Sequence, residues 1–343
     1  MKNIQKFMRQ DLLQGFPAYA PSRALPDPSF LKLDSGENLW APNFGTNNSL
    51  YPDSQVLKLR EELSADFGVP IESIVVGNGS DELIDLVCRL FISPGDKVID
   101  FPPAFPMFSL FAKLSRGQVI SVKRTNSFDV DLVKARIAMQ DAKLTFLDNP
   151  NNPTGTLLSR EKILELLQIG TPLVVDEAYF EFCGETVIDL VEKFENLIVL
   201  RTFSKWAGIA GLRVGVMIAN PKVIKALMRI KAPYNVNAVG QEAALKVLQN
   251  KEKFLPVLKT LCNSRDWFVM EVNRIPGFRA IPSRASSVTV VLEKFEAKIV
   301  AQRLFEAKIL VKVLPESLIS NALRISIAPR QEMQRVVDVL RTI

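Results

Sequence analysis

The feature that most constrains the fold is a rhythm of short apolar runs, each followed by a polar turn and then by a helical pattern. Within it, residues 82–91 repeat apolar side chains at helical spacing. Such alternation predicts the α/β class, a mostly parallel sheet with helices on both faces. The runs expected to be strands are residues 73–76, 96–101, 117–124, 143–150, 172–180, 196–205 and 212–219.

The pattern changes near residue 236, where two helical stretches precede a second set of strands. We therefore expect a large domain over residues 33–235 and a smaller C-terminal α/β domain over residues 236–343. Residues 1–32 are rich in proline and predict an N-terminal arm that packs on the small domain or on a partner subunit. The later elements are strands 286–292, 310–314 and 322–328 and helices 296–308 and 330–342.

The chain contains no histidine, and this absence narrows the chemistry. It excludes Ser-His-Asp and Cys-His nucleophilic catalysis, histidine general bases and histidine-ligated metals. Three distant cysteines, Cys88, Cys183 and Cys262, argue against a disulfide framework and against a zinc site of the C-x-x-C type. Proton transfer must then use Lys, Asp, Glu, Tyr, Cys or a cofactor, and no metal site is expected.

The charge pattern indicates small anionic ligands rather than nucleic acid. The net charge is +6, but acidic and basic residues are interspersed and no four basic residues are consecutive. No apolar run reaches the ~18 residues of a membrane span. Residues 1–16 lack a signal-peptide core and include Asp11, so we expect a cytoplasmic protein without membrane contact.

Polar clusters follow four of the expected strands, at the edge where open parallel sheets bind ligands. Each cluster alone is compatible with a helix cap, a turn or a solvated charge. They are Gly77–Asp81, Asn149–Gly155, the group Asp176, Glu177 and Tyr179, and the group Ser204, Lys205 and Arg213.

Together the clusters indicate one cofactor. A partly buried Lys205 can act as a nucleophile toward an aldehyde, and Asp176 at the end of an apolar strand needs a positively charged partner. Arg213 and the helix start at residues 79–81 suit a phosphate. Asn152 and Tyr179 can hold a ring hydroxyl. Pyridoxal 5′-phosphate (PLP) has all of these groups.

The sequence also resembles the fold-type I PLP-dependent aminotransferases through NPNNPTG, DEAY and TFSKWAGIAGLRVG. Further segments, LDSGENLWAP, YPD, GNGSDELIDL, PPAFPMF and LRISIAPR, extend the match over nearly the whole chain to the histidinol-phosphate aminotransferase family. The resemblance implies a large, mostly parallel seven-stranded sheet, a homodimer, and the reaction of histidinol phosphate with 2-oxoglutarate in histidine biosynthesis.

The resemblance also implies roles for individual residues. Lys205 would bind the cofactor and shuttle a proton, Asp176 would keep the ring nitrogen protonated, and Tyr179 would hold the ring hydroxyl with Asn152. Tyr51 would reach the cofactor phosphate of the neighbouring subunit. The other expected cofactor contacts are Gly79, Ser80, Asp81, Phe105, Ser204 and Arg213.

The residues implied on the substrate side are Tyr19, Asn38, Arg324 and Lys312. Arg324 would bind the acidic group of the substrate, and Tyr19 its phosphate. Lys312 stands where the family often has arginine, and a lysine is a point charge rather than a fork. Trp40 and Val216 also depart from the family pattern.

These departures leave two alternatives open. An aromatic-amino-acid aminotransferase or a threonine-phosphate decarboxylase would keep the cofactor and change the substrate. A PLP-binding regulator without turnover is disfavoured, because no basic helix-turn-helix segment precedes residue 33 and the catalytic set is complete.

The turn that holds Asn152 yields one local prediction. A strand-end turn that aims this side chain at a ring needs a tight bend. The Asn152–Pro153 peptide bond is therefore predicted to be cis.

Overall fold

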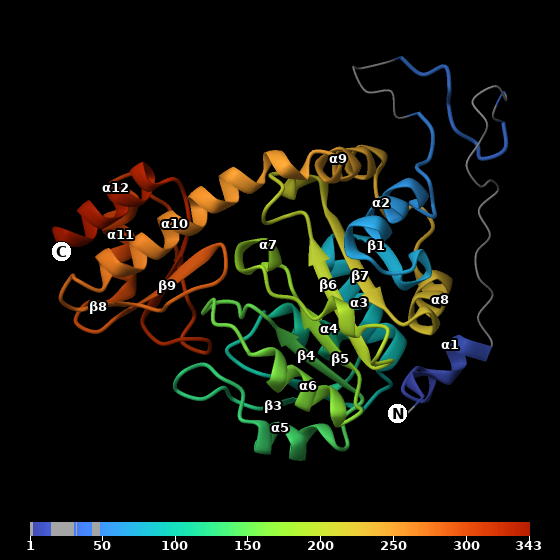
Figure 1. Ribbon diagram of the computed structural model, residues 1–343, viewed down its shortest axis with the longest axis horizontal. Coiled ribbons are helices and arrows are strands. Elements are labelled where there is room, and N and C mark those ends of the chain that lie inside the picture. Colours follow the sequence, from blue (N-terminus) through green and yellow to red (C-terminus); the bar gives the residue numbers. More distant parts are fainter. Residues whose placement is uncertain (1–2, 15–30, 32, 43–48) are drawn as a thin grey trace.

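The computed structural model describes residues 3–14, 31, 33–42 and 49–343, which form two sheets, each with its own helices (Figure 1). The larger sheet contains β1 (Ile74–Asn78), β2 (Lys97–Asp100), β3 (Gln118–Ser121), β4 (Leu144–Asp148), β5 (Leu173–Asp176), β6 (Leu197–Thr202) and β7 (Val214–Ala219). The smaller sheet contains β8 (Phe278–Ala280), β9 (Ser287–Leu292), β10 (Lys312–Val313) and β11 (Ala322–Ser326). The helices are α1 (Gln10–Gln14), α2 (Leu57–Phe67), α3 (Gly79–Phe91), α4 (Met107–Leu114), α5 (Leu132–Met139), α6 (Arg160–Gln168), α7 (Phe180–Cys183), α8 (Pro221–Ile230), α9 (Ala238–Leu248), α10 (Leu255–Val272), α11 (Ala297–Glu306) and α12 (Arg330–Arg341).

The larger sheet has seven strands in the order β1-β7-β6-β5-β4-β2-β3. Strands β2 to β6 pair in parallel, and β7 runs antiparallel to both of its neighbours. The expected mostly parallel seven-stranded sheet is confirmed. Its register sets Asp148, the last residue of β4, level with Asp176, the last residue of β5.

The strands are apolar on both faces, because helices cover both sides of the sheet. In β6, Leu197 and Val199 join the core on one face, while Ile198 and Leu200 join the core on the other. Successive side chains of a strand point to opposite faces, so a strand covered on both sides needs a continuous apolar run. The predicted apolar face of residues 82–91 is buried in α3.

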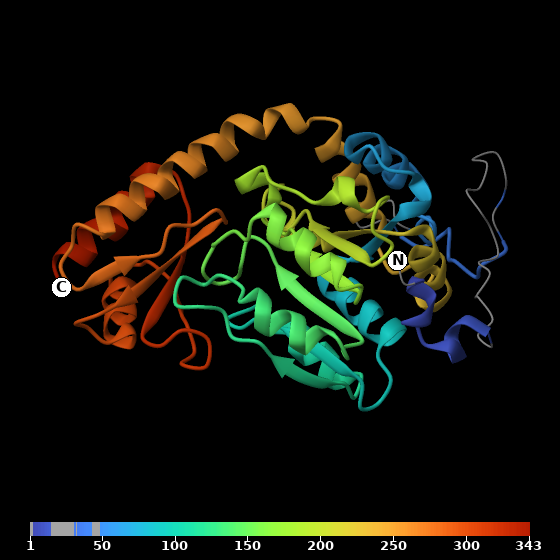
Figure 2. The same cartoon turned by 60° about the horizontal axis from the view of Figure 1, so that its bottom comes forward.

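The smaller sheet is antiparallel, in the order β10-β11-β9-β8, and has its own apolar core with α11 and α12. Helix α10 runs from the larger unit to the smaller one (Figure 2). The predicted strand over residues 310–314 shortens to Lys312–Val313. The domain boundary near residue 236 stays a prediction; Ala244 and Val247 of α9 pack in the core beside the larger sheet.

The two units meet at the turn after β4. Thr289 donates its hydroxyl to the carbonyl of Pro153 (2.7 Å), and Arg324 donates Nη1 to Asn152 Oδ1 (2.7 Å). A Cβ on Gly155 would lie 2.0 Å from Ser283 Oγ, and the φ of this glycine is +74°. The Asn152–Pro153 peptide bond is cis, which confirms the prediction. The smaller sheet therefore contacts the loop that carries Asn152.

None of the helices within the described ranges is long and apolar enough to cross a membrane.

Candidate active site

A pocket lies at the carboxyl ends of β4, β5 and β6. The start of α3, the loop after β2 and the loop before β7 complete its walls. The predicted site residues that it brings together are Ser80, Asp81, Phe105, Asn152, Asp176, Tyr179, Ser204, Lys205 and Arg213.

One end of the pocket offers hydrogen-bond donors to an anion. The side chain of Asn78, the N-cap residue of α3, makes no capping hydrogen bond, and Arg213 donates to Asp81 (3.1 Å) and to Ser204 (3.4 Å) beside this helix start. A Cβ on Gly79 would lie 2.4 Å from Arg213 Nη2, and one on Gly215 would lie 2.4 Å from the Gly79 carbonyl carbon. The two glycines therefore let β7 and the guanidinium of Arg213, the residue before β7, approach the helix start, an arrangement that suits a phosphate.

The other end contains a buried acid that the protein hardly compensates. Asp176 is 5% exposed and accepts a hydrogen bond from the backbone N–H of Ala178 (3.0 Å). No lysine or arginine of the described chain forms an ion pair with it. Burial, followed by the negative charge of Asp148, raises the pKa of Asp176 to about 7. Such a carboxylate suits a ligand that brings a proton or a positive charge.

Lys205 and Tyr179 share this pocket. The Lys205 ammonium lies 6.0 Å from the centre of the Tyr179 ring. Lys205 is accessible from the pocket, yet the protein around its amine lowers its pKa by desolvation, and the positive charge of Arg324 adds to the effect. Burial raises the pKa of Tyr179 to about 12. The site thus combines an amine whose pKa is lowered with a phenol whose pKa is raised.

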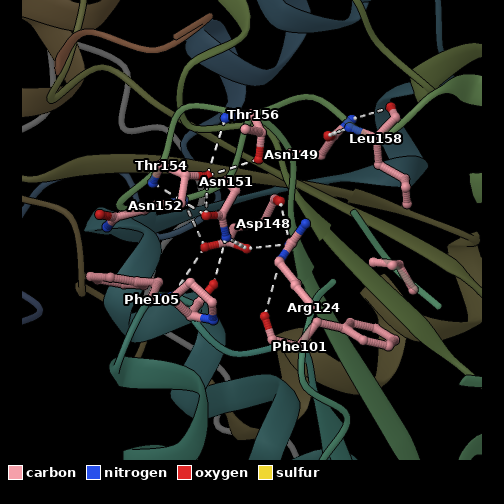
Figure 3. A network of polar contacts seen from close by, with 12 residues as sticks. Phe101, Phe105, Arg124, Asp148, Asn149, Asn151, Asn152, Thr154, Thr156 and Leu158 are labelled. Atoms are coloured by element: carbon pink, nitrogen blue, oxygen red, sulfur yellow. Dashed lines mark hydrogen bonds and ion pairs between the residues drawn. The ribbon is translucent and has the colours of Figure 1, made fainter. Parts of the chain in front are cut away.

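Three residues of the wall, Asp148, Ala178 and Thr202, were not predicted, and Pro150 was expected only as part of the cluster Asn149–Gly155. Asp148 is the centre of a hydrogen-bond network that includes Phe105, Arg124 and Asn151 (Figure 3). The signal for Asp148 was present, because it ends an apolar strand just as Asp176 does. Ala178 and Thr202 carried no such signal, since neither residue type by itself indicates a ligand.

Two predicted cofactor or substrate residues lie elsewhere on the surface. Tyr51 is 54% exposed and stacks on Tyr234, with ring centres 4.5 Å apart, in a separate groove. Asn38 is exposed and accepts a hydrogen bond from the backbone N–H of Trp40 (3.2 Å). Neither residue lines the pocket of this chain.

The two basic residues predicted to bind the substrate lie at different distances from the pocket wall. Arg324 reaches the pocket rim through its hydrogen bond to Asn152. Lys312 is exposed and does not line the pocket, but it is level with Arg324 across the β10–β11 pair. Directly opposed residues of an antiparallel pair share a face of the sheet. Tyr19 lies outside the described residues.

The donor set of the pocket fits PLP. The helix start and Arg213 suit its phosphate, the buried Asp176 suits its protonated ring nitrogen, and the Lys205 amine suits its aldehyde. The strongest sign of fit is the carboxylate of Asp176, which the protein leaves with one backbone donor.

Comparison with known proteins agrees with this reading. Residues 41–340 match the family described as aminotransferase class I and II. A histidinol-phosphate aminotransferase from Dehalococcoides mccartyi is 38% identical over 351 residues, covering 98% of each chain.

Two solved structures share the fold. The histidinol-phosphate aminotransferase of Sinorhizobium meliloti, in complex with pyridoxal-5′-phosphate, has a TM-score of 0.79 at 26% identity, covering 86% of this chain and 84% of that one. The L-threonine-O-3-phosphate decarboxylase of Porphyromonas gingivalis has a TM-score of 0.77 at 25% identity, covering 86% of this chain and 90% of that one. The same fold therefore serves two reactions on phosphorylated amines.

Proposed function

The chain belongs to the aminotransferase class I and II family, and from that premise we propose that it transfers the amino group of L-histidinol phosphate to 2-oxoglutarate, with PLP as cofactor. The products would be imidazole-acetol phosphate and glutamate. The observation that carries the proposal is the buried Asp176, which lacks an ion-pair partner in the described chain and shares a pocket with Lys205. The choice of substrate is supported by the relative that is 38% identical over 98% of each chain.

Each part of the pocket would hold one part of the cofactor. Arg213 and Ser204, with the first N–H groups of α3, would hold the phosphate. Asp176 would keep a proton on the ring nitrogen, Tyr179 would donate to the ring hydroxyl, and Phe105 would cover a ring face. When bound, PLP supplies an aldehyde carbon that bonds to amines and a ring that accepts electrons.

Lys205 would do the proton transfer. Its Nζ would attach to the cofactor at rest and, once released, would take the proton from the substrate carbon that bears the amino group. The lowered pKa of Lys205 leaves more of the amine in the neutral form that accepts a proton. Deeply buried Asp176 and Tyr179 would hold their partners in a fixed orientation while this proton moves.

Arg324 and Lys312 would recognise the acidic group of the substrate. They are level with each other across β10 and β11, so two positive charges stand on one face of the smaller sheet. Paired cations suit a phosphate or a carboxylate. A second candidate, a threonine-phosphate decarboxylase, is supported by the shared fold of the Porphyromonas gingivalis enzyme. Lys312, a point charge where the family often has the fork of an arginine, leaves the choice between the two phosphorylated substrates open.

We further propose that the working unit is a homodimer in the cytoplasm. Exposed Tyr51 and Val239 line the groove around Tyr234 together with polar residues, and these two side chains offer apolar surface to a second copy. All three cysteines of the chain are free thiols, as a reducing compartment favours. Sedimentation of the PLP-loaded protein measures its oligomeric state, and a monomer at working concentration would contradict the dimer.

The function is tested by a single-turnover experiment. The PLP-loaded protein is mixed with L-histidinol phosphate, L-phenylalanine or L-threonine phosphate, and the absorbance of the bound cofactor is followed. Fast bleaching with histidinol phosphate, reversed by imidazole-acetol phosphate, is expected. Bleaching with phenylalanine alone, or release of CO₂ from threonine phosphate, would replace the proposed substrate; PLP that stays bound and unchanged with all three would contradict the proposal.

A further inference from the structure

We propose that the buried Arg124–Asp148 ion pair is a positioning pair of the pocket, which fixes Phe105 and Asn152 relative to each other. The inference rests on the proposed function, because these two residues are positioned for PLP. Both charged side chains are almost fully buried, 1% exposed for Arg124 and 3% for Asp148, at 3.0 Å from each other. Figure 3 shows Asp148 at the centre of the network.

One oxygen of Asp148 joins two walls of the pocket. Its Oδ2 accepts the backbone N–H of Phe105 (3.0 Å) and the backbone N–H of Asn152 (2.9 Å). Phe105 belongs to the loop between β2 and α4, whereas Asn152 belongs to the turn after β4. A shift of this oxygen therefore moves the residue proposed for the ring face against the residue proposed for the ring hydroxyl.

The other oxygen of Asp148 is held as firmly. Its Oδ1 accepts Nδ2 of Asn151 (2.8 Å) and Nη2 of Arg124 (3.0 Å). All four partners of the carboxylate are donors, so the position requires a group that only accepts. An asparagine at this position would turn its NH₂ group toward two of the donors.

Arg124 connects the carboxylate to a third segment of the chain. Besides Asp148, it donates to the carbonyls of Phe101 (3.0 Å) and Phe128 (3.2 Å). These carbonyls are neutral, so Asp148 supplies the negative charge that compensates the buried guanidinium. Removal of one partner would leave the other charge buried and unpaired.

The chain offers a matched control on the neighbouring strand. Glu177 and Arg201 are 2.7 Å apart and 2% and 5% exposed, and Glu177 also accepts the hydroxyl of Thr186 (2.7 Å) and the backbone N–H of Val187 (2.7 Å). This carboxylate is as buried as Asp148 and is likewise surrounded by donors. Glu177 does not line the pocket. Its substitution therefore measures the loss of stability from breaking a buried ion pair, without a direct effect on cofactor binding.

The test compares Asp148→Asn with Glu177→Gln in the full chain. PLP is titrated into the cofactor-free protein by tryptophan fluorescence, the induced circular dichroism of bound PLP is recorded, and melting temperatures are measured. Both variants should melt earlier, but only Asp148→Asn should weaken PLP binding by about ten-fold or more and change the induced signal. Arg124→Lys, which keeps the charge and loses the fork, should weaken binding less.

The outcomes separate this inference from the proposed function. Wild-type protein that does not bind PLP overturns the proposed function. Wild-type protein that binds PLP, with Asp148→Asn unchanged in affinity and induced signal, overturns the positioning role; so does an equal loss of affinity in Glu177→Gln. If Asp148→Asn does not fold, Arg124→Lys decides, and an unchanged PLP affinity there overturns the inference.

Discussion

Asp148 and Asp176 end neighbouring strands, are level in register and are both buried, yet the protein satisfies only one of them. Asp148 accepts hydrogen bonds from Phe105, Asn151, Asn152 and Arg124. Asp176 accepts one from Ala178 and has no ion-pair partner in the part of the chain that the structure describes. Burial raises the pKa of Asp176 to about 7, and the charge of Asp148 adds to this.

This difference in hydrogen bonding shows that Asp148 is part of the structural framework, whereas Asp176 is part of the binding site. A buried acid with a full set of donors holds elements together, and its loss costs stability. A buried acid without them weakens the cofactor-free protein and gains its compensation from a ligand. Substitution of pocket residues that lack a protein partner, such as Asp176, should therefore reduce turnover or cofactor binding without destabilising the cofactor-free fold.

The largest expected effect is at Lys205. Lys205→Ala should reduce turnover by at least about 10³-fold, because it removes both the attachment point and the proton carrier. The melting temperature of the cofactor-free protein should hardly change, since this side chain is accessible. Stopped-flow turnover and calorimetry check the two statements, and a variant that transaminates at the wild-type rate would remove Lys205 from the mechanism.

Most substitutions of buried residues lower stability, but Asp176→Asn should raise the stability of the cofactor-free protein. Turnover should fall by about 10²–10³-fold, the effect of losing one preorganised charge. At pH 8 the cofactor-free variant should nevertheless be more stable than wild type by up to a few kcal/mol. Asp148→Asn should lower stability instead, so the two substitutions test the comparison directly.

The pH dependence of the same variant has a defined sign. The pKa of Asp176 in the folded protein is raised from its ordinary 3.8 to about 7. The contribution of this group to the free energy of unfolding is therefore fully present below pH 3.8 and is lost as the pH rises through 7. The advantage of Asp176→Asn should therefore grow between pH 5 and pH 8 in urea unfolding of the cofactor-free protein. An advantage that is constant with pH would show that Asp176 does not titrate in this range.

Substitution of Arg213 should have a smaller effect, a loss of cofactor affinity with little change in stability. Arg213→Gln should weaken PLP binding by about 10–100-fold, the cost of losing a hydrogen bond to a charged group. Its ion pair with Asp81 is half-exposed (41% and 42%), so stability should change little. Arg160→Gln breaks a comparable surface pair with Asp189, and neither of these residues lines the pocket. This variant serves as control; equal losses in both variants would contradict the phosphate role.

The smallest expected effect is at Lys312. Lys312→Arg should lower KM for histidinol phosphate by about two- to five-fold at unchanged kcat, because a guanidinium offers a fork to the phosphate where the ammonium offers a point charge. Steady-state kinetics with histidinol phosphate and with glutamate check this. An unchanged KM for both would place Lys312 outside substrate recognition.

Much of the sheet and of the pocket was predictable from the sequence, because both depend on local order along the chain. Continuous apolar runs such as residues 197–200 predict strands buried on two faces, and the strand ends identify Lys205 and Asp176 without any contact being known. The same rule could have identified Asp148, which ends residues 143–148 in the same way.

Tertiary structure alone decided which of these residues the protein satisfies. Two of the four donors to Asp148 come from Phe105 and Arg124, far from it in sequence, whereas no charged donor of the described chain reaches Asp176. The position of Lys312 likewise depends on the register of the β10–β11 pair, which places it opposite Arg324. Lys312 does not line the pocket. The sequence order of side chains determines periodicity and strand ends, whereas hydrogen bonding and charge compensation depend on distances that only the packed chain defines.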